Sequence, residues 1–249
     1  MRRFLFRAHI WLGWIVGLQL LFWTLSGLVM TAMPIEEVRG EHLRAVPQAP
    51  PLSQASGLLP PEALLARAGA DGDTLTLRWL GGRPVWELRD ADQPARLFDA
   101  RTGAPVLLDT AAIAALARAR YAGKGRLVAV EPVDPADPPL EFRRDMPAWV
   151  ARFDDGEGTR FYLDAGSGEL LAVRTDRWRL FDLMWGLHIM DLKHREDMNH
   201  PLLVGMAGLA LVTVAGGLAL LGWRAWPGRR RRAADHDNDR PSARPLSPR

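Results

Sequence analysis

The sequence predicts a membrane α+β protein, in which two transmembrane helices flank an extracytoplasmic domain of two tandem units, each a helix followed by an antiparallel sheet. Three observations lead to this fold class. Two long apolar runs lie near the ends of the 249-residue chain, arginines flank each run on its outer side, and a degenerate repeat fills the middle. The chain has no cysteine, which excludes disulfides, thiolate metal sites, thiol nucleophiles and c-type haem attachment.

The two apolar runs cover residues 10–33 and 201–223. The first has about 24 residues, and at 1.5 Å each these reach roughly 36 Å, enough to cross ~30 Å of hydrocarbon. A cleaved signal peptide would have a shorter apolar region of about 7–15 residues and a small-x-small cleavage site. The sequence Thr31-Ala32-Met33 is a poor site of that kind, so we expect an uncleaved anchor.

The arginines predict the orientation of the spans. Arg2, Arg3 and Arg7 precede the first run, and Arg224 and residues 229–232 follow the second. Because positive residues favour the cytoplasmic side, we expect a multi-pass protein of the bacterial inner membrane with both termini in the cytoplasm and the central domain in the periplasm. These basic residues flank apolar runs instead of lining a folded surface, so no nucleic-acid partner is expected.

The central domain contains a repeat with an offset of about 63 to 65 residues, typical of a duplicated unit. Alternating strands lead in both copies to similar turns, at 99–103 and 164–168. Helical patterns at 61–68 and 110–121 precede the strands. We expect the strand positions Trp86, Phe98, Trp149 and Phe161 to form the core.

These patterns divide the chain into eight segments. They are a cytoplasmic N-terminus (1–9), the first span (10–33), a linker (34–57), the first unit (58–108), the second unit (109–175), a membrane-proximal helical segment (176–200), the second span (201–223) and a basic, disordered cytoplasmic tail (224–249).

Several short motifs resemble the PepSY-associated transmembrane family. The first span carries His9-x-Trp11-x-Gly13 and Thr24-x-Ser26-Gly27, and Trp185-Gly186-Leu187-His188 precedes the second span. Each repeat unit, with its strand, Asp-x-x-Thr/Ser-Gly turn and further strand, looks like a PepSY domain. The resemblance extends from about residue 7 to residue 223 and implies a short, two-span form of this family.

Longer members of that family are similar to ferric-siderophore reductases that carry b-type haem. The resemblance therefore implies a haem-binding electron-transfer component of the inner membrane, linked to ferric iron or siderophore reduction. It implies at most a subunit of a membrane oxidoreductase, with no catalytic residue of its own and with a flavin reductase as a partner, since the chain shows two spans and no flavin or nucleotide domain.

The resemblance makes His9, His188 and His200 the candidate ligands of haem iron, because neutral imidazole is a usual axial ligand. The two axial nitrogens of one haem lie roughly 4 Å apart, at about 2 Å per metal–nitrogen bond. His9 and His200 lie at opposite ends of spans that are roughly 30 Å long, so they cannot share an iron within one chain. His188 and His200 can share one at the outer face, while His9 needs a partner protein or its copy in a homodimer.

Two other functions stay open. The PepSY-like units could form a membrane-anchored module, without a cofactor, that binds a periplasmic protein or regulates a peptidase. The chain could also be a structural subunit of a redox complex. Copper or zinc bound by the outer histidines with Asp191, Glu196 or Asp197 is a further alternative to haem. The small residues along both spans either pack the two helices together or make room for a flat cofactor.

Overall fold

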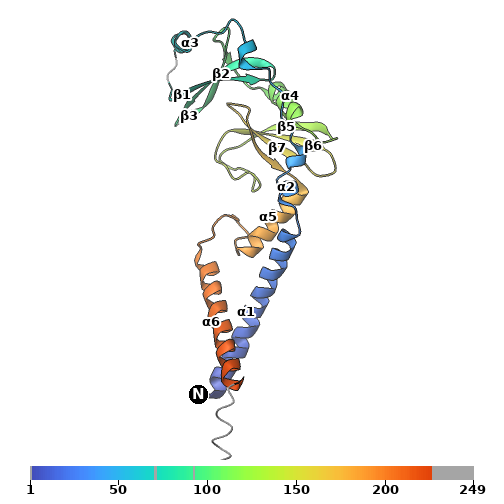
Figure 1. The fold of residues 1–249 in the computed structure, drawn as a ribbon, viewed down its shortest axis with the longest axis vertical. Helices are drawn as coiled ribbons and strands as arrows, with labels where there is room; N and C mark the ends of the chain where they lie inside the picture. Colours follow the sequence, from blue (N-terminus) through green and yellow to red (C-terminus); the bar gives the residue numbers. More distant parts are fainter. Residues whose placement is uncertain (1, 70–71, 92, 226–249) are drawn as a thin grey trace, which may run out of the picture. The chain divides into compact units, whose positions relative to one another are not determined.

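The computed structural model of the protein describes residues 2–69, 72–91 and 93–225. Along the chain, one long helix precedes two four-stranded sheets and another long helix follows them (Figure 1). The helices are α1 (Arg2–Thr31), α2 (Ile35–Val38), α3 (Pro61–Ala68), α4 (Thr110–Arg120), α5 (Asp176–His188) and α6 (Pro201–Ala225), with single 3₁₀ turns at Glu41–Leu43 and Leu52–Gln54. The strands are β1 (Thr74–Leu80), β2 (Arg83–Asp90), β3 (Gln93–Asp99), β4 (Pro105–Val106), β5 (Arg126–Val133), β6 (Ala148–Asp154), β7 (Arg160–Asp164) and β8 (Leu170–Arg174).

The chain divides into two compact units, which are not the two repeat units of the sequence. The first combines residues 1–25 with residues 197–249, and the second is Ser26–Glu196. Two helical stretches are long and apolar enough to cross a membrane, His9–Thr31 and Pro201–Gly222. They agree with the two spans expected from the sequence. The basic tail lies outside the described residues from residue 226 onward.

Local signals explain where the shorter helices begin and end. Helix α3 has a proline at its first position, which needs no N–H there, and Gly69 ends it in the left-handed conformation. Helix α4 begins after Asp109, whose carboxylate accepts a hydrogen bond from the backbone N–H of Ala112 at 2.8 Å. Both helices match the bounds predicted from the sequence to within a residue.

Both sheets are antiparallel meanders of four strands, in the orders β1-β2-β3-β4 and β5-β6-β7-β8. The same turn leads from the third strand to the fourth in each. Asp99 accepts hydrogen bonds from the backbone N–H groups of Arg101 and Thr102, and Asp164 does so from Gly166 and Ser167. The repeat seen in the sequence therefore corresponds to two sheets with one strand order and one turn.

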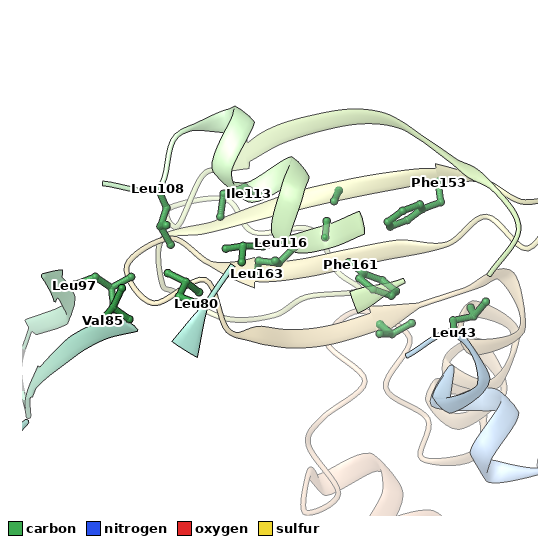
Figure 2. Close-up of a cluster of buried hydrophobic side chains, with 13 residues drawn as sticks. Leu43, Leu80, Val85, Leu97, Leu108, Ile113, Leu116, Phe153, Phe161 and Leu163 are labelled. Carbon is green, nitrogen blue, oxygen red and sulfur yellow. The ribbon is translucent and has the colours of Figure 1, made fainter. Parts of the chain in front are cut away.

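The largest core cluster joins the two sheets (Figure 2). Helix α4 covers one face of the second sheet, where Ile113 and Leu116 pack with Phe161 and Leu163. Aromatic stacking extends this cluster, since the ring centroids of Tyr121 and Phe153 lie 3.9 Å apart. The members are Leu43, Leu80, Val85, Leu97, Leu108, Ile113, Leu116, Ala117, Ala151, Phe153, Phe161, Leu163 and Val173.

Two smaller clusters complete the interior. On the other face of the second sheet, Phe142 from the β5–β6 connection stacks on Tyr162 with 4.6 Å between ring centroids. In the first sheet, Leu88 and Phe98 pack beneath Leu64 of α3. The second sheet is thus covered on both faces.

The expected core was right for two aromatic residues and wrong for two. Phe98 and Phe161 are buried, whereas Trp86 and Trp149 are only half-buried at the margins of their clusters. The indole N–H of Trp86 donates to the carbonyl oxygen of Leu59 at 3.2 Å, so the polar edge of this ring needs a place at the rim.

The segment expected to be a linker, 34–57, is structured in its first half. Val38 of α2 and Leu43 are buried, and Leu43 belongs to the largest core cluster. The backbone of this segment also pairs with the end of α4, because the N–H of Ala45 donates to the carbonyl oxygen of Arg120. The second sheet is therefore packed against residues that directly follow α1.

Candidate functional site

The candidate site is the segment in which α5 meets the end of α1. Thr175 caps α5, since its hydroxyl oxygen accepts from the backbone N–H of Trp178 at 3.1 Å. The helix ends at His188, and Met190 and Arg195 adopt positive φ angles of 58° and 59° in the loop that follows. The helical segment predicted for 176–200 is thus helical only in its first half.

His188 lies directly against α1. The Nδ1 atom of its ring is 3.0 Å from the hydroxyl oxygen of Ser26, which is fully buried. A Cβ atom added to Gly27 would lie 3.5 Å from Cε1 of the same ring, so the imidazole covers this glycine. The hydrogen bond and the close packing hold the ring in one orientation.

Helix α5 also carries a buried carboxylate, that of Asp182, which was not singled out from the sequence. The side chain of Asp182 is 7% exposed. It accepts hydrogen bonds from Arg143 at 2.6 and 2.7 Å and from Arg195 at 2.7 Å. A lone charge within the apolar stretch Leu180–Trp185 was the sequence signal for this cluster. A buried carboxylate needs such partners because removing it from water is costly.

A second ionic cluster lies beside it. Glu141 accepts hydrogen bonds from the hydroxyl of Tyr162 at 2.6 Å, from Arg160 at 2.9 Å and from Arg179 at 2.7 Å. Burial alone would raise the pKa of Glu141, but the hydrogen bonds from Arg179 and Tyr162 outweigh it and lower the pKa below the ordinary value.

Two arginines flank Trp178. The guanidinium carbon of Arg174 lies 4.1 Å from the ring centroid, and that of Arg143 lies 5.9 Å from it. Burial lowers the pKa of Arg174 to about 10. The indole N–H of Trp185 donates to the carbonyl oxygen of Arg195 at 3.1 Å. Both tryptophans therefore hold the arginines of this segment in place.

The other two candidate ligands belong to the first unit. His9 is half-exposed in the first turns of α1. His200 directly precedes α6, and its Nδ1 atom accepts a long hydrogen bond of 3.4 Å from the backbone N–H of Leu203. The three histidines are thus divided between the two compact units, with His9 and His200 in the first and His188 in the second.

The described residues offer no group of three or more His, Cys, Asp or Glu side chains placed to hold a metal ion. The carboxylate of Asp191, considered above as a copper or zinc ligand, accepts instead from the backbone N–H groups of His194 and Glu196. It organises the loop after α5.

The small residues of the spans have open space beside them. Apart from the nearby backbone of its own helix, a Cβ atom added to Gly13, Gly17, Gly205 or Gly208 would meet no described atom within 4 Å. These four glycines are therefore not points of close contact, whereas Gly27 of the same stripe is covered by His188.

Comparison with known families decides the membership. A family model described as the PepSY-associated TM region matches residues 6–238, from the start of the first span to beyond the second. The chain belongs to this family. Together with the two candidate membrane helices, membership of the PepSY-associated TM family indicates a membrane protein. Comparisons with curated proteins and with solved structures returned no significant match.

Proposed function

We propose that this member of the PepSY-associated TM family is a haem-binding electron-transfer component of the bacterial inner membrane, in which His188 would hold the haem iron. The observation that carries the proposal is the contact between Ser26 and His188 at the end of α1. Histidines that bind metals usually have their second ring nitrogen hydrogen-bonded, which sets the tautomer and the orientation of the ring. The Ser26 hydroxyl can play that part through Nδ1 and direct Nε2 toward an iron.

Bound haem b would supply reversible uptake and release of one electron. The chain would contribute the ligand and its orientation, and the buried Ser26 hydroxyl would tune the basicity of the imidazole. The electrons would come from a partner such as a flavin reductase and pass to an extracytoplasmic acceptor, of which ferric iron or a ferric siderophore is the proposed class.

We propose His200 as the second outer ligand and His9 as the ligand of an inner site. His200 fits less well, because its Nδ1 atom faces the N–H of Leu203 and coordination through Nε2 would require this long hydrogen bond to be given up. The open space beside Gly13, Gly17, Gly205 and Gly208 supports a homodimer or a partner membrane protein. Helices of a second chain would also supply walls that two helices cannot provide.

Single replacements test the ligands. We expect His188→Ala to lose most of the haem per protein, measured in detergent from the reduced-minus-oxidised spectrum. His200→Ala should lose less, and His9→Ala should behave separately. His194→Ala is the matched control, since His194 is exposed in the same loop. Ser26→Ala should keep haem but shift its reduction potential.

A full haem complement in the His188→Ala variant would contradict the ligand assignment. A wild-type protein that takes up no haem when haem is abundant would contradict the redox function as a whole.

A second function, the cofactor-free binding module, is favoured by a charged recess of about 370 Å³. Three arginines and two glutamates line it, and the Nη1 atom of Arg120 is buried there without a partner among the described residues. Its lining residues are Thr76, Arg78, Glu87, Arg89, Arg120 and Glu169. The excess of guanidinium groups suits a carboxylate. A labelled acidic peptide should then bind the wild type, and Arg120→Gln should weaken the binding.

We also propose that both termini are cytoplasmic and that the sheets are periplasmic, from the placement of Arg2, Arg3 and Arg7 before the first span. Alkaline phosphatase fused after Asp109 should be active, and the same enzyme fused after Arg232 should be inactive. The reverse pattern of activities would contradict this orientation and the role given to the sheets.

A further inference from the structure

Helix α5 buries a charged side chain and exposes leucines, the reverse of a helix on the surface of a soluble protein. Asp182, one of its four charged residues, is buried, and so are Gly186 and the capping residue Ile189 on the same side. On the opposite side Leu180 and Leu183 are 46% and 42% exposed. Positions 180, 183 and 187 recur at the helical period, so the exposed Leu180 and Leu183 and the half-buried Leu187 share one side of the helix.

This arrangement is unfavourable in water. Exposed leucines gain nothing from an aqueous surface, and a buried carboxylate has to be neutralised. The structure provides that neutralisation through Arg143 and Arg195, which both hydrogen-bond to Asp182. Beyond its exposed first turn, α5 therefore directs its charged side chain at the protein and its leucines away from it, as expected for a helix whose outer neighbour is apolar.

The depth of α5 follows from its contact with α1. His188, the last residue of α5, is hydrogen-bonded to Ser26, which lies five residues before the end of the candidate span at Thr31. At 1.5 Å per residue this is about 7.5 Å along the helix. The C-terminal end of α5 therefore lies beside span residues, and Arg174, Arg177 and Arg179 gather around its beginning.

We propose that α5 is an interfacial helix that lies in the outer leaflet of the bilayer, with Leu180 and Leu183 in contact with acyl chains. The arginines at its start would then lie at the level of the lipid phosphates, where basic residues are favoured. The proposal requires α1 to cross the membrane, and it is independent of haem binding.

The absence of cysteine makes the test direct. Leu180→Cys and Leu183→Cys are each prepared in the full-length protein, spin-labelled, and reconstituted into vesicles of phosphatidylcholine and phosphatidylglycerol. The collision rates of the label with oxygen, which concentrates in lipid, and with a water-soluble nickel chelate are then measured. Leu107→Cys, at a highly exposed site before α4, is the control for water, and Leu211→Cys, exposed in the middle of α6, is the control for hydrocarbon.

We expect the oxygen-to-nickel ratio at positions 180 and 183 to exceed the ratio at position 107 several-fold and to approach that at position 211. Nickel accessibility equal to that at position 107 would overturn the proposal, because the two leucines would then face water. Shielding from both reagents would overturn it as well, since a second copy or another helix would then cover the leucines. All four sites are exposed, so the labels should leave the core intact, which circular dichroism of the sheets can check.

Discussion

The two sheets have the same strand order and the same Asp-based turn, but they differ in how they are covered. The second sheet packs under α4 on one face and against Phe142 on the other. The first sheet has the small cluster of Leu64, Leu88 and Phe98, and only its turn-proximal residues reach the large core. The repeated sequence pattern thus gives both sheets the same strand order, while the segments around each sheet determine how much apolar surface it buries.

Replacing matched phenylalanines should give the largest contrast. Phe161 is fully buried in the large cluster, so Phe161→Ala should lower the free energy of unfolding by about 3–5 kcal/mol. Phe98→Ala should cost less, about 2–3 kcal/mol, because Phe98 lies in a smaller cluster that can close more easily over the cavity left behind. Chemical denaturation of the full-length protein in detergent, followed by circular dichroism, measures both values. Equal losses would mean that the two sheets are equally well packed.

The matched turn glycines should show a smaller contrast. Gly103 and Gly168 have φ angles of 73° and 69°, a region that costs other residues about 1–2 kcal/mol. A Cβ atom at Gly168 would also lie 2.7 Å from the side chain of Leu116 in α4, whereas at Gly103 its nearest neighbour is the flexible side chain of Arg67 at 3.0 Å. Gly168→Ala should therefore lower the melting temperature more than Gly103→Ala. The opposite order would show that the turn of the first sheet is the more constrained one.

The smallest effect should come from the ionic cluster beside the second sheet. The pKa of Glu141 is lowered in the folded protein, so its contribution to stability is present above the ordinary carboxyl pKa of about 4.3 and is lost as the pH falls through the lowered value. The melting temperature of the wild type should fall with acid more steeply than that of Glu141→Gln. Glu196→Gln, at an exposed residue of the loop after α5, should retain the wild-type slope.

The parts of the fold that follow from local signals could be predicted from the sequence. The bounds of α3 follow from its proline and Gly69, and the two turns follow from Asp99 and Asp164. The burial of Leu43 could not be predicted, because a short segment with no periodicity gives no sign of the sheet it will contact. Trp149 was misjudged because a strand pattern shows which face a residue takes, not how far along that face the core extends.

The candidate site, too, could be predicted from the sequence only in part. The order of the motifs pointed to His188, but its contact with Ser26 links positions far apart in the chain and has no local signal. The Asp182 cluster likewise depends on Arg143 and Arg195, which come from two separate loops. Asp182 was not singled out from the sequence, although it is the one charge in the stretch Leu180–Trp185, and the sequence alone does not identify its two arginine partners.

The packing of Leu43 has a consequence for the order in which the protein folds. Leu43 and Gly40 follow the first span directly, but they pack against Val173 in the last strand of the second sheet. The large core can therefore close only after almost the whole central domain has been synthesised. Contacts between such distant parts of a chain slow folding. Until β8 arrives, the apolar side chains of the earlier strands have no complete core to enter, and this interval is when a chaperone or a protease would have access to them.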